Sequence, residues 1–500
     1  MIDLKKGFDT FLVWALRILI LFIIGGTIVK SYLFDEVTKF SLVLIVLSIL
    51  FILGIYISIK KDVNKVILMT FILIIALVVR LLWFYNIDSI PVGDFNRMFI
   101  CAGDFLSGTT YMFKGTAYMG RFPHMTITVL YFALIRNIFS NPLVAIKLIN
   151  IIFSMINVVL LYFLGKEVFR SKEIGIGVMA FAAIFPPMII YNNVFCSENM
   201  AIPLLIISVL MILKGYKSNN LWKTSLLICG AGIFLSLAQL FRPVGYVVIV
   251  AYIMYIFIYF KEGIKLKVLG VINVILSFIL PWALVSYLLI ALNITEYPLW
   301  HGTEPLSISM LKGTNIESQG RWNEEDSAIF NKYDGDYEKV DEEAKSIIKD
   351  RLTETPKLKL LTFYITKFMN EWNTGDFAGA YWAENGLDEG YNREEYLDIL
   401  GKTEGKMLIR MSTEGIVYTK FFWVFIVIMT YIGLYRNRLE RNYSIDLFYI
   451  IFGGASLFGL ITEFQDRYTY PYSWIFIILA FTAFNFNKKE NRESIFYYNK

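Results

Sequence analysis

Ionisable side chains stand at the ends of several long apolar runs in this 500-residue sequence. Ionisable groups at membrane depth are costly to desolvate, so residues in such places are candidates for function. A carboxylate there could accept a proton as a general base, and an arginine could pair with a phosphate through its planar fork of donors. The candidates are Asp94, Asp104, Arg121, His124, Glu198, Arg242, Glu463, Asp466 and Arg467.

Asp94 is the first candidate for a general base. It lies in the stretch IPVGDF at 90–95, just beyond an apolar run that carries Arg80. Partial burial in a cleft would raise the pKa of this carboxyl toward a range that suits proton transfer. The alternative is a helix N-cap, since a helical pattern follows it, and one residue could serve both roles. Asp104 repeats the Gly-Asp-Phe context and is the second candidate.

Arg121 and His124 open the next apolar run, in the stretch RFPH. Its proline is an ordinary helix start. His124 is one of only two histidines, which excludes a His-rich metal site. It either hydrogen-bonds locally or contributes to a site. Glu198 follows the end of another apolar run, and it either binds an acceptor hydroxyl or begins the next helix, where a negative charge is favoured.

Arg242 and Arg467 are candidates for binding a phosphate. Each lies beside an apolar run, and arginine pairs with phosphate in a bidentate geometry. The alternative is that they anchor helix ends at the membrane interface, with Tyr468 and Tyr470 in an aromatic belt. Both interpretations stay open at this point.

Several other kinds of site are excluded by the sequence. Asp334-Gly335-Asp336 has the form of a nucleotide-sugar metal motif, but its neighbours form a solvated acidic run without the later ligand of a calcium loop. No glycine-rich phosphate loop ends in Lys-Ser or Lys-Thr, so ATP-driven transport is not expected. The three cysteines are scattered, and no basic, aromatic-rich patch predicts a nucleic-acid partner.

The composition requires much of the chain to lie in an apolar environment. Hydrophobic residues make up 57% and charged residues 18%, whereas soluble domains average about 45–50% and about 25%. A membrane-crossing helix needs about 20 apolar residues. We therefore predict an all-α integral membrane protein with about 12 transmembrane helices. The runs are 11–29, 41–59, 66–85, 143–165, 174–192, 200–213, 222–240, 244–260, 268–291, 418–435, 446–462 and 470–486.

Lys and Arg in short loops favour the cytoplasm and so predict the orientation. With both termini in the cytoplasm, the basic loops between these runs are also cytoplasmic, provided that the run 125–139 does not cross the membrane. We predict that 125–139 is an interfacial or re-entrant helix on the outer face. The resulting divisions are 1–65 with two N-terminal spans, 66–291 as a membrane core with an outer loop at 86–142, 292–417 as an acidic extracytoplasmic region, and 418–500 with three spans and a cytoplasmic tail.

The region 292–417 differs from the rest of the chain in charge. It holds 24 acidic and 14 basic residues, a net charge of −10, while the remainder holds 18 acidic and 33 basic, a net charge of +15. Within it, 338–351 predicts a charged surface helix. The run 357–372 has apolar residues at helical spacing and predicts a helix along the membrane surface.

The order of these residues resembles that of the GT-C-type membrane glycosyltransferases, and most closely their family 39, the dolichyl-phosphate-mannose–protein mannosyltransferase-like proteins. A span with an arginine precedes Asp94 in the first outer loop. The similarity is greater over about 66–260 than over 292–485. Further motifs typical of the family are RFPH at 121–124, Asn141-Pro142 before a span that ends in LGKEVF, Ser197-Glu198, Phe241-Arg242-Pro243 and Glu463-x-x-Asp466-Arg467-Tyr468.

The resemblance implies a GT-C fold with 1–65 added before it, and transfer of a sugar from a polyprenyl-phosphate donor to a hydroxyl at the outer face, with inversion. Asp94 would be the catalytic base, and Arg242 and Arg467 would bind the lipid phosphate. The residues expected to shape the acceptor side are Asp104, Arg121, His124 and Glu198. No cofactor is certain; a divalent cation stays open, since some GT-C enzymes need one and others do not.

The acceptor does not follow from the resemblance, and a glycan, a lipid or a protein remains open. A polyprenyl-phosphate flippase or transporter would use the same arginines without a base, although the sequence has no internal repeat of the kind that transporters show. A polysaccharide polymerase or ligase is a third alternative. Abundant Ile, Lys and Asn with few Cys indicate a bacterial plasma membrane.

Overall fold

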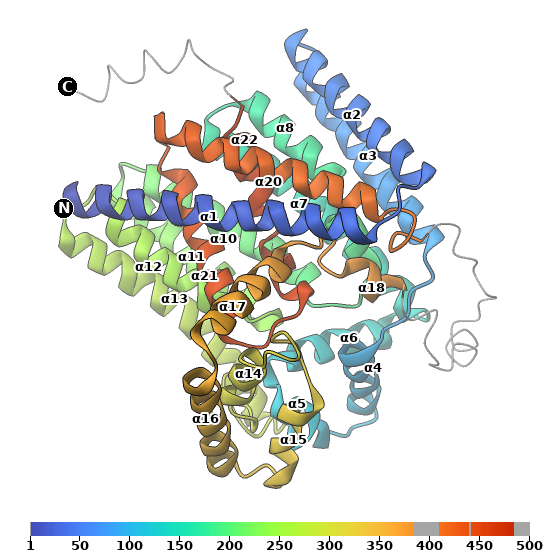
Figure 1. The fold of residues 1–500 in the computed structure, drawn as a ribbon, viewed down its shortest axis with the longest axis vertical. Coiled ribbons are helices and arrows are strands. Elements are labelled where there is room, and N and C mark those ends of the chain that lie inside the picture. Colours follow the sequence, from blue (N-terminus) through green and yellow to red (C-terminus); the bar gives the residue numbers. More distant parts are fainter. Residues whose placement is uncertain (1, 385–409, 440–441, 485–500) are drawn as a thin grey trace.

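The computed structural model describes residues 2–384, 410–439 and 442–484, and within them every regular element is a helix (Figure 1). Nine of these helices are long and apolar enough to cross a membrane. The predicted all-α integral membrane protein is therefore confirmed. The nine segments are Gly7–Lys30 of α1 (Ile2–Phe34), α2 (Lys39–Lys60), α3 (Lys65–Asn86), α7 (Pro142–Phe169), α10 (Glu198–Lys217), α11 (Leu221–Phe241), α13 (Ile264–Ala291), Ile416–Arg436 of α20 (Ile416–Leu439), and α21 (Ser444–Ile461).

Three of the twelve predicted spans take another form, so the count of twelve is not confirmed. The run 174–192 divides into α8 (Lys172–Ala183) and a second piece beginning at Pro186, bent by 57°. The run 244–260 forms α12 (Gly245–Tyr259), which has only 15 residues. The run 470–486 begins inside a 3-10 helix, η5 (Asp466–Tyr472), and continues as the seven-residue α22 (Ile475–Phe481). Residues 485–500, with the predicted cytoplasmic tail, lie outside the described residues.

Polar caps explain where several of the long helices begin. The side chain of Asn141 accepts a hydrogen bond from the Val144 N–H, and Pro142 occupies the first turn of α7. Asn64, Ser171 and Asn220 cap α3, α8 and α11 in the same way. Such caps satisfy N–H groups that the helix itself leaves without partners. The Asn141-Pro142 pair of the sequence is thus a helix start.

The predicted helix after RFPH is present as α6 (Thr126–Ile138). Its 13 residues are too few to cross a bilayer, which agrees with the prediction that this run does not span. It packs against α4 (Gly93–Leu106) and α7. Together with α5 (Tyr118–Arg121), α4 and α6 occupy one end of the molecule, at the lower right of Figure 1.

A small helical subdomain, residues 302–354, lies at the same end of the molecule (Figure 1). It consists of α14 (Leu306–Gly313), α15 (Glu324–Lys332) and α16 (Tyr337–Glu354), and α16 contains the predicted surface helix. Its apolar side chains form a cluster separate from the large membrane core. The buried members of that cluster are Ile308, Leu311, Ile329, Phe330, Val340 and Ala344.

The predicted helix at 357–372 is present as α17 (Lys357–Trp372). It packs against α1, α21 and η5. Its C-terminal half is buried, including Phe368 and Trp372. The helix therefore joins the helical subdomain to the membrane-spanning bundle. The short helix α18 (Gly379–Glu384) follows it.

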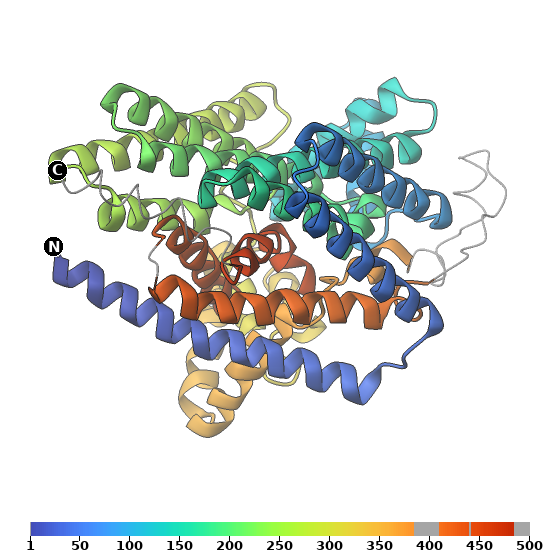
Figure 2. The same cartoon turned by 90° about the horizontal axis from the view of Figure 1, so that it is seen from above.

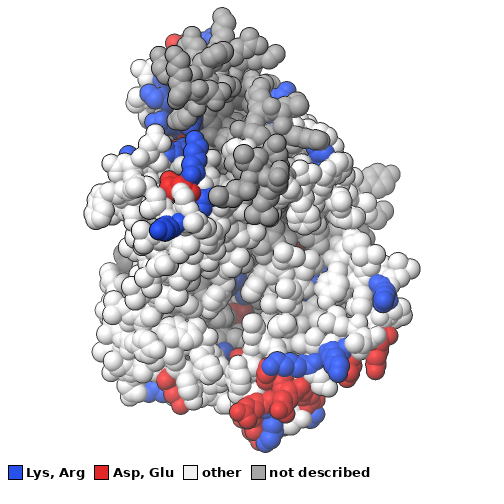
Figure 3. Space-filling view, turned by 90° about the vertical axis from the view of Figure 1, so that its left-hand side faces the viewer, with Lys and Arg blue, Asp and Glu red and all other residues white. Residues whose placement is uncertain are grey.

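A helix from the beginning of the chain packs against one from its last hundred residues. Helix α1 runs along α20, and Figure 2 shows the two side by side. The space-filling view in Figure 3 shows charged side chains gathered at the end that holds α15 and α16, beside a broad area with few of them. A further group of charged side chains, mostly Lys and Arg, lies at the opposite end (upper left in Figure 3). A band with few charges between two charged ends suits a bundle that is embedded in a membrane.

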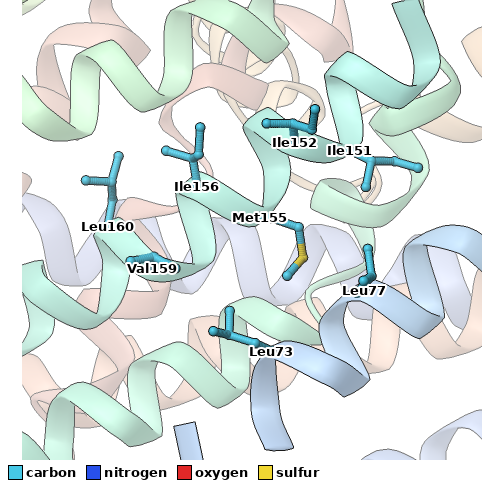
Figure 4. Close-up of a pocket in the computed structure, with 8 residues that line it drawn as sticks. All are labelled: Leu73, Leu77, Ile151, Ile152, Met155, Ile156, Val159 and Leu160. Atoms are coloured by element: carbon cyan, nitrogen blue, oxygen red, sulfur yellow. The ribbon is translucent and has the colours of Figure 1, made fainter. Parts of the chain in front are cut away.

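An apolar hollow of about 350 Å³ lies between α3 and α7. Figure 4 shows its lining, in which Leu73 and Leu77 come from α3 and the other six side chains come from α7. No polar side chain lines it. The hollow therefore has no group that could carry out proton transfer or bind a phosphate, and the candidate site lies elsewhere.

Candidate active site

Asp94 lies in the first turn of α4, directly after Gly93. Gly93 has a φ of +53°, which favours glycine, and a Cβ there would lie 3.4 Å from the Trp382 ring. The N-cap position is Val92, and no side chain caps the helix. The N-cap interpretation of Asp94 is therefore wrong, and its carboxylate is available for other partners.

Both oxygens of Asp94 are held by side chains from distant segments. The Tyr118 hydroxyl donates to Oδ1 at 2.5 Å, and Arg467 Nη2 donates to Oδ2 at 3.0 Å. The Asp94 side chain is 29% exposed while that of Arg467 is 2% exposed. The carboxylate is thus partly exposed, whereas the arginine is enclosed by protein.

The partners of Asp94 decide its ionisation. Burial acts to raise its pKa, but Arg467, the Tyr118 hydrogen bond and Arg97 act in the opposite direction, and the pKa lies below its ordinary value. The expected rise in the pKa of Asp94 is therefore wrong, because the arginine outweighs the desolvation. At neutral pH the residue is an ionised carboxylate, the form that a general base needs.

Arg467 has donors left over after it binds Asp94. Its Nε and Nη1 groups are buried and have no hydrogen-bond partner within the described residues. Its guanidinium carbon lies 4.7 Å from the ring centroid of Phe95 and 4.7 Å from that of Trp382, and the two rings are 5.0 Å apart. This aromatic corner holds the cation in place. Unpartnered buried donors are costly, so they point to a ligand that accepts hydrogen bonds.

Glu198 and Arg242 form a second ion pair, with Oε1 and Nε 3.3 Å apart. Glu198 is in the first turn of α10 after Ser197, so it also begins that helix, as the alternative interpretation expected. Here the burial is reversed: Glu198 is fully buried and Arg242 is 13% exposed. The guanidinium of Arg242 lies 4.9 Å from the ring centroid of Tyr468.

His124 is electrostatically coupled to both ion pairs. Burial lowers its pKa to about 4, with Arg242 and Arg467 acting in the same direction and Asp94 and Glu198 opposing them. The imidazole is therefore neutral at neutral pH. Four of the predicted site residues thus form two ion pairs, and a fifth is close enough to respond to their charges.

Two predicted residues lie away from this group. Asp104 is ten residues beyond Asp94 on α4, a separation of about 15 Å along a helix. Arg121 is bound through Nε and Nη2 to Glu304, at 3.0 Å for Nε, and lies over the ring of Phe330. Arg121 therefore contacts the helical subdomain through Glu304 and Phe330.

Tyr118, Phe95 and Trp382 were not predicted as site residues. Phe95 is a sequence neighbour of Asp94, and Tyr118 lies three residues before Arg121, so both were close to predicted residues. Trp382 comes from α18, in the region 292–417, and nothing in the sequence connects it with Asp94. No cluster of three or more metal-binding side chains occurs within the described parts of the chain.

Comparison with protein families gives a partial match. A family model described as dolichyl-phosphate-mannose-protein mannosyltransferase matches residues 124–285, less than half of the chain. The predicted resemblance is confirmed over this range, which contains His124, Glu198 and Arg242. Asp94 and Arg467 lie outside it. No curated protein matches the chain significantly.

Among solved structures, the chain is similar to an archaeal oligosaccharyltransferase, AglB from Archaeoglobus fulgidus, in complex with an inhibitory peptide and a dolichol-phosphate. The sequences are 13% identical and the TM-score is 0.48. The match covers 85% of this chain and 50% of the archaeal chain, so this chain spans half the length of that protein.

Proposed function

We propose that the protein is a membrane glycosyltransferase that moves a sugar from a polyprenyl-phosphate donor to an acceptor hydroxyl, with Asp94 as the general base. The observation that carries this proposal is the Asp94–Arg467 pair. It combines an ionised, partly open carboxylate with an arginine whose remaining buried donors have no partner in the part of the chain that the structure describes. The family match over 124–285 supports the class of donor.

The reaction is a single displacement at the anomeric carbon. Asp94 takes the proton of the acceptor hydroxyl as that oxygen forms a bond to the sugar, and the bond between the anomeric carbon and the phosphate oxygen breaks. The electron pair of the broken bond goes to the phosphate. Because the acceptor attacks opposite the leaving phosphate, the configuration is inverted.

The two arginines would stabilise the leaving phosphate. Arg467 offers Nε and Nη1, and Arg242 reaches the site from α11. Without a ligand, two arginines and two carboxylates balance in charge. A phosphodiester donor adds one negative charge, and the reaction moves a second one onto the phosphate as Asp94 becomes neutral. Donors fixed in a water-poor site stabilise such developing charge most effectively.

The bound donor would also raise the pKa of Asp94, the proposed base. A lowered pKa makes Asp94 a weak proton acceptor on its own, but a bound phosphate places a negative charge beside it. Like charges raise the pKa of a carboxyl. Arg467 would share its charge between Asp94 and the phosphate, which weakens its effect on Asp94. Proton transfer would thus become favourable only when donor is bound.

The basic loops support a site on the extracytoplasmic side of a bacterial plasma membrane, with both termini in the cytoplasm. Asp94 and Tyr118 belong to α4 and α5, and His124 lies just before α6; these three helices lie at one end of the molecule (Figure 1). The loops on that side carry few Lys and Arg in short connections, whereas the opposite helix ends carry Lys60, Lys65, Lys166 and Lys217.

The experiment compares two aspartates in the same local sequence. Purified protein in liposomes is given a labelled polyprenyl-phosphate sugar and a mixture of glycan, lipid and peptide acceptors. We expect Asp94→Asn to abolish transfer and Asp104→Asn to retain it. Retained transfer in Asp94→Asn contradicts the base assignment, and movement of the donor across the bilayer without transfer by the wild type indicates a flippase.

A further inference from the structure

Residues 462–465 connect α21 to η5, whose first two residues are Asp466 and Arg467. The connection contains no helix, so helical hydrogen bonds do not fix its position. The position of Arg467 therefore depends on what this connection and Asp466 contact, together with the packing of η5 against α10, α17 and α21.

Backbone contacts join this segment to the helical subdomain. The Glu463 N–H donates to the Ser309 carbonyl at 2.6 Å, and the Phe464 N–H donates to the Gly320 carbonyl at 2.9 Å. At the end of α14, a Cβ on Gly313 would lie 2.6 Å from the Thr462 carbonyl. Only glycine allows this close approach.

Two ion pairs reinforce the same contact. Lys312 Nζ lies 3.2 Å from Glu463 Oε2, and both side chains are largely buried. Arg321 Nη2 donates to Asp466 Oδ1 at 3.0 Å, and its guanidinium lies 4.7 Å from the ring centroid of Phe464. The residue next to Arg467 in the sequence is thus held by a side chain of the subdomain.

The subdomain also binds the segment that carries Tyr118. Arg121, at the end of α5, pairs with Glu304 and lies over Phe330 of α15. The Thr303 N–H donates to the Gly120 carbonyl at 3.1 Å. One folded unit with its own apolar cluster therefore contacts the segments on both sides of the Asp94–Arg467 pair.

We propose that the helical subdomain sets the position of Arg467 relative to Tyr118 and Asp94, and that Lys312 and Arg321 are positioning residues for phosphate binding by Arg467. The inference rests on the proposed function for its kinetic consequence. A shift of the 462–466 segment would move the Nε and Nη1 donors of Arg467 out of line with the phosphate, while the membrane core would remain folded.

The test uses two double variants that remove the same charge from the same subdomain. Lys312→Ala/Arg321→Ala removes the contacts to the segment. Lys332→Ala/Lys345→Ala removes two exposed ion pairs, with Glu343 and Asp341, that do not touch it. We expect the first variant to exchange backbone hydrogen faster over 463–472 and to bind undecaprenyl phosphate in detergent about threefold to tenfold more weakly, as expected for one or two lost ion pairs. The second variant should match the wild type in hydrogen exchange over 463–472 and in binding of undecaprenyl phosphate.

In the transfer assay, the KM for the donor should rise in the first variant with a smaller change in kcat and none in the KM for the acceptor. When Arg321→Lys replaces Arg321→Ala in the first double variant, most of the donor affinity should be restored. Unchanged hydrogen exchange over 463–472, or equal donor binding by the two double variants, would overturn the inference. If the wild type transfers no sugar and binds no undecaprenyl phosphate, the proposed function fails, and the exchange over 463–472 still decides whether the subdomain holds this segment.

Discussion

The two arginine–carboxylate pairs of the site have similar separations and opposite burial. In the Asp94–Arg467 pair the carboxylate is 29% exposed and the arginine 2%. In the Glu198–Arg242 pair the carboxylate is fully buried and the arginine is 13% exposed. Of the two carboxylates, only that of Asp94 is open enough to receive a proton from a substrate, whereas Glu198 is enclosed and contacts Arg242. Under the proposed function, Asp94 therefore takes the proton and Glu198 orients Arg242.

The largest expected difference between the two ion pairs appears when their arginines are replaced. Arg467→Met should reduce kcat about 100-fold to 1,000-fold, as the loss of a donor to a developing oxyanion does in other enzymes. Arg242→Met should mainly raise the KM for the donor, because Arg242 has no bond to the base. Single-turnover rates at saturating donor measure the difference. Equal losses of kcat in both variants would break the comparison.

A smaller effect is expected from Glu198→Gln. The amide keeps the shape of the side chain but leaves the Arg242 charge without its partner, so that arginine would become less well oriented. We expect the KM for the donor to rise about tenfold, the size of one hydrogen bond to a charged group, with kcat little changed. A loss of kcat comparable to that of Asp94→Asn would show that Glu198 takes part in proton transfer.

Trp382→Ala tests the aromatic corner on the Asp94–Arg467 side. A cation–π contact contributes about 0.5–2 kcal/mol, so donor affinity should fall about twofold to thirtyfold. Tyr381→Ala is the matched control, because Tyr381 is exposed and adjacent in the sequence. Trp382→Phe should keep much of the affinity. If Trp382→Ala and Tyr381→Ala behave alike, the corner does not hold Arg467.

The smallest effect concerns pH and stability. The pKa of His124 is about 4 in the folded protein and its ordinary value is 6.5. Between these values only the unfolded chain binds the proton, so the contribution of His124 makes the protein less stable as the pH falls from 6.5 toward 4. Asp94 contributes stability that is lost only below its ordinary value of 3.8. The two residues therefore act in different pH windows.

The measurement is the thermal unfolding midpoint in detergent at pH 7.5 and pH 5. The midpoint should fall less between the two pH values in His124→Gln than in the wild type. His301→Gln is the control, because His301 is exposed. An identical fall in His124→Gln and wild type would mean that burial does not lower the pKa of His124 in the folded protein.

The membrane character and most of the helices were predictable, because apolar runs and basic loops are properties of the local sequence. The number of spans was not predictable. Pro186 and Pro187 break one run, and the apolar residues after Tyr472 are buried in the bundle in a helix of seven residues. Hydropathy records composition, and it does not distinguish a helix facing lipid from a short segment enclosed by protein.

For the candidate site, a location at the end of an apolar run predicted Asp94, Glu198, Arg242 and Arg467. These four residues form the two ion pairs. The same kind of location also predicted Asp104, which has the same neighbours as Asp94 but lies far along the helix. The pKa of Asp94 was predicted in the wrong direction because the sequence does not show that Arg467 contacts it. Trp382 was missed for the same reason.

Asp94 and Arg467 are 373 positions apart in the sequence. A ribosome that inserts the chain from its N-terminus exposes Asp94 early and supplies Arg467 only near the end of synthesis. Until α21 and η5 have been inserted, Asp94 has no Arg467 to pair with. If the proposed function holds, an incomplete chain left in the membrane would therefore be inactive toward lipid-linked sugars, whatever part of the core it had already folded.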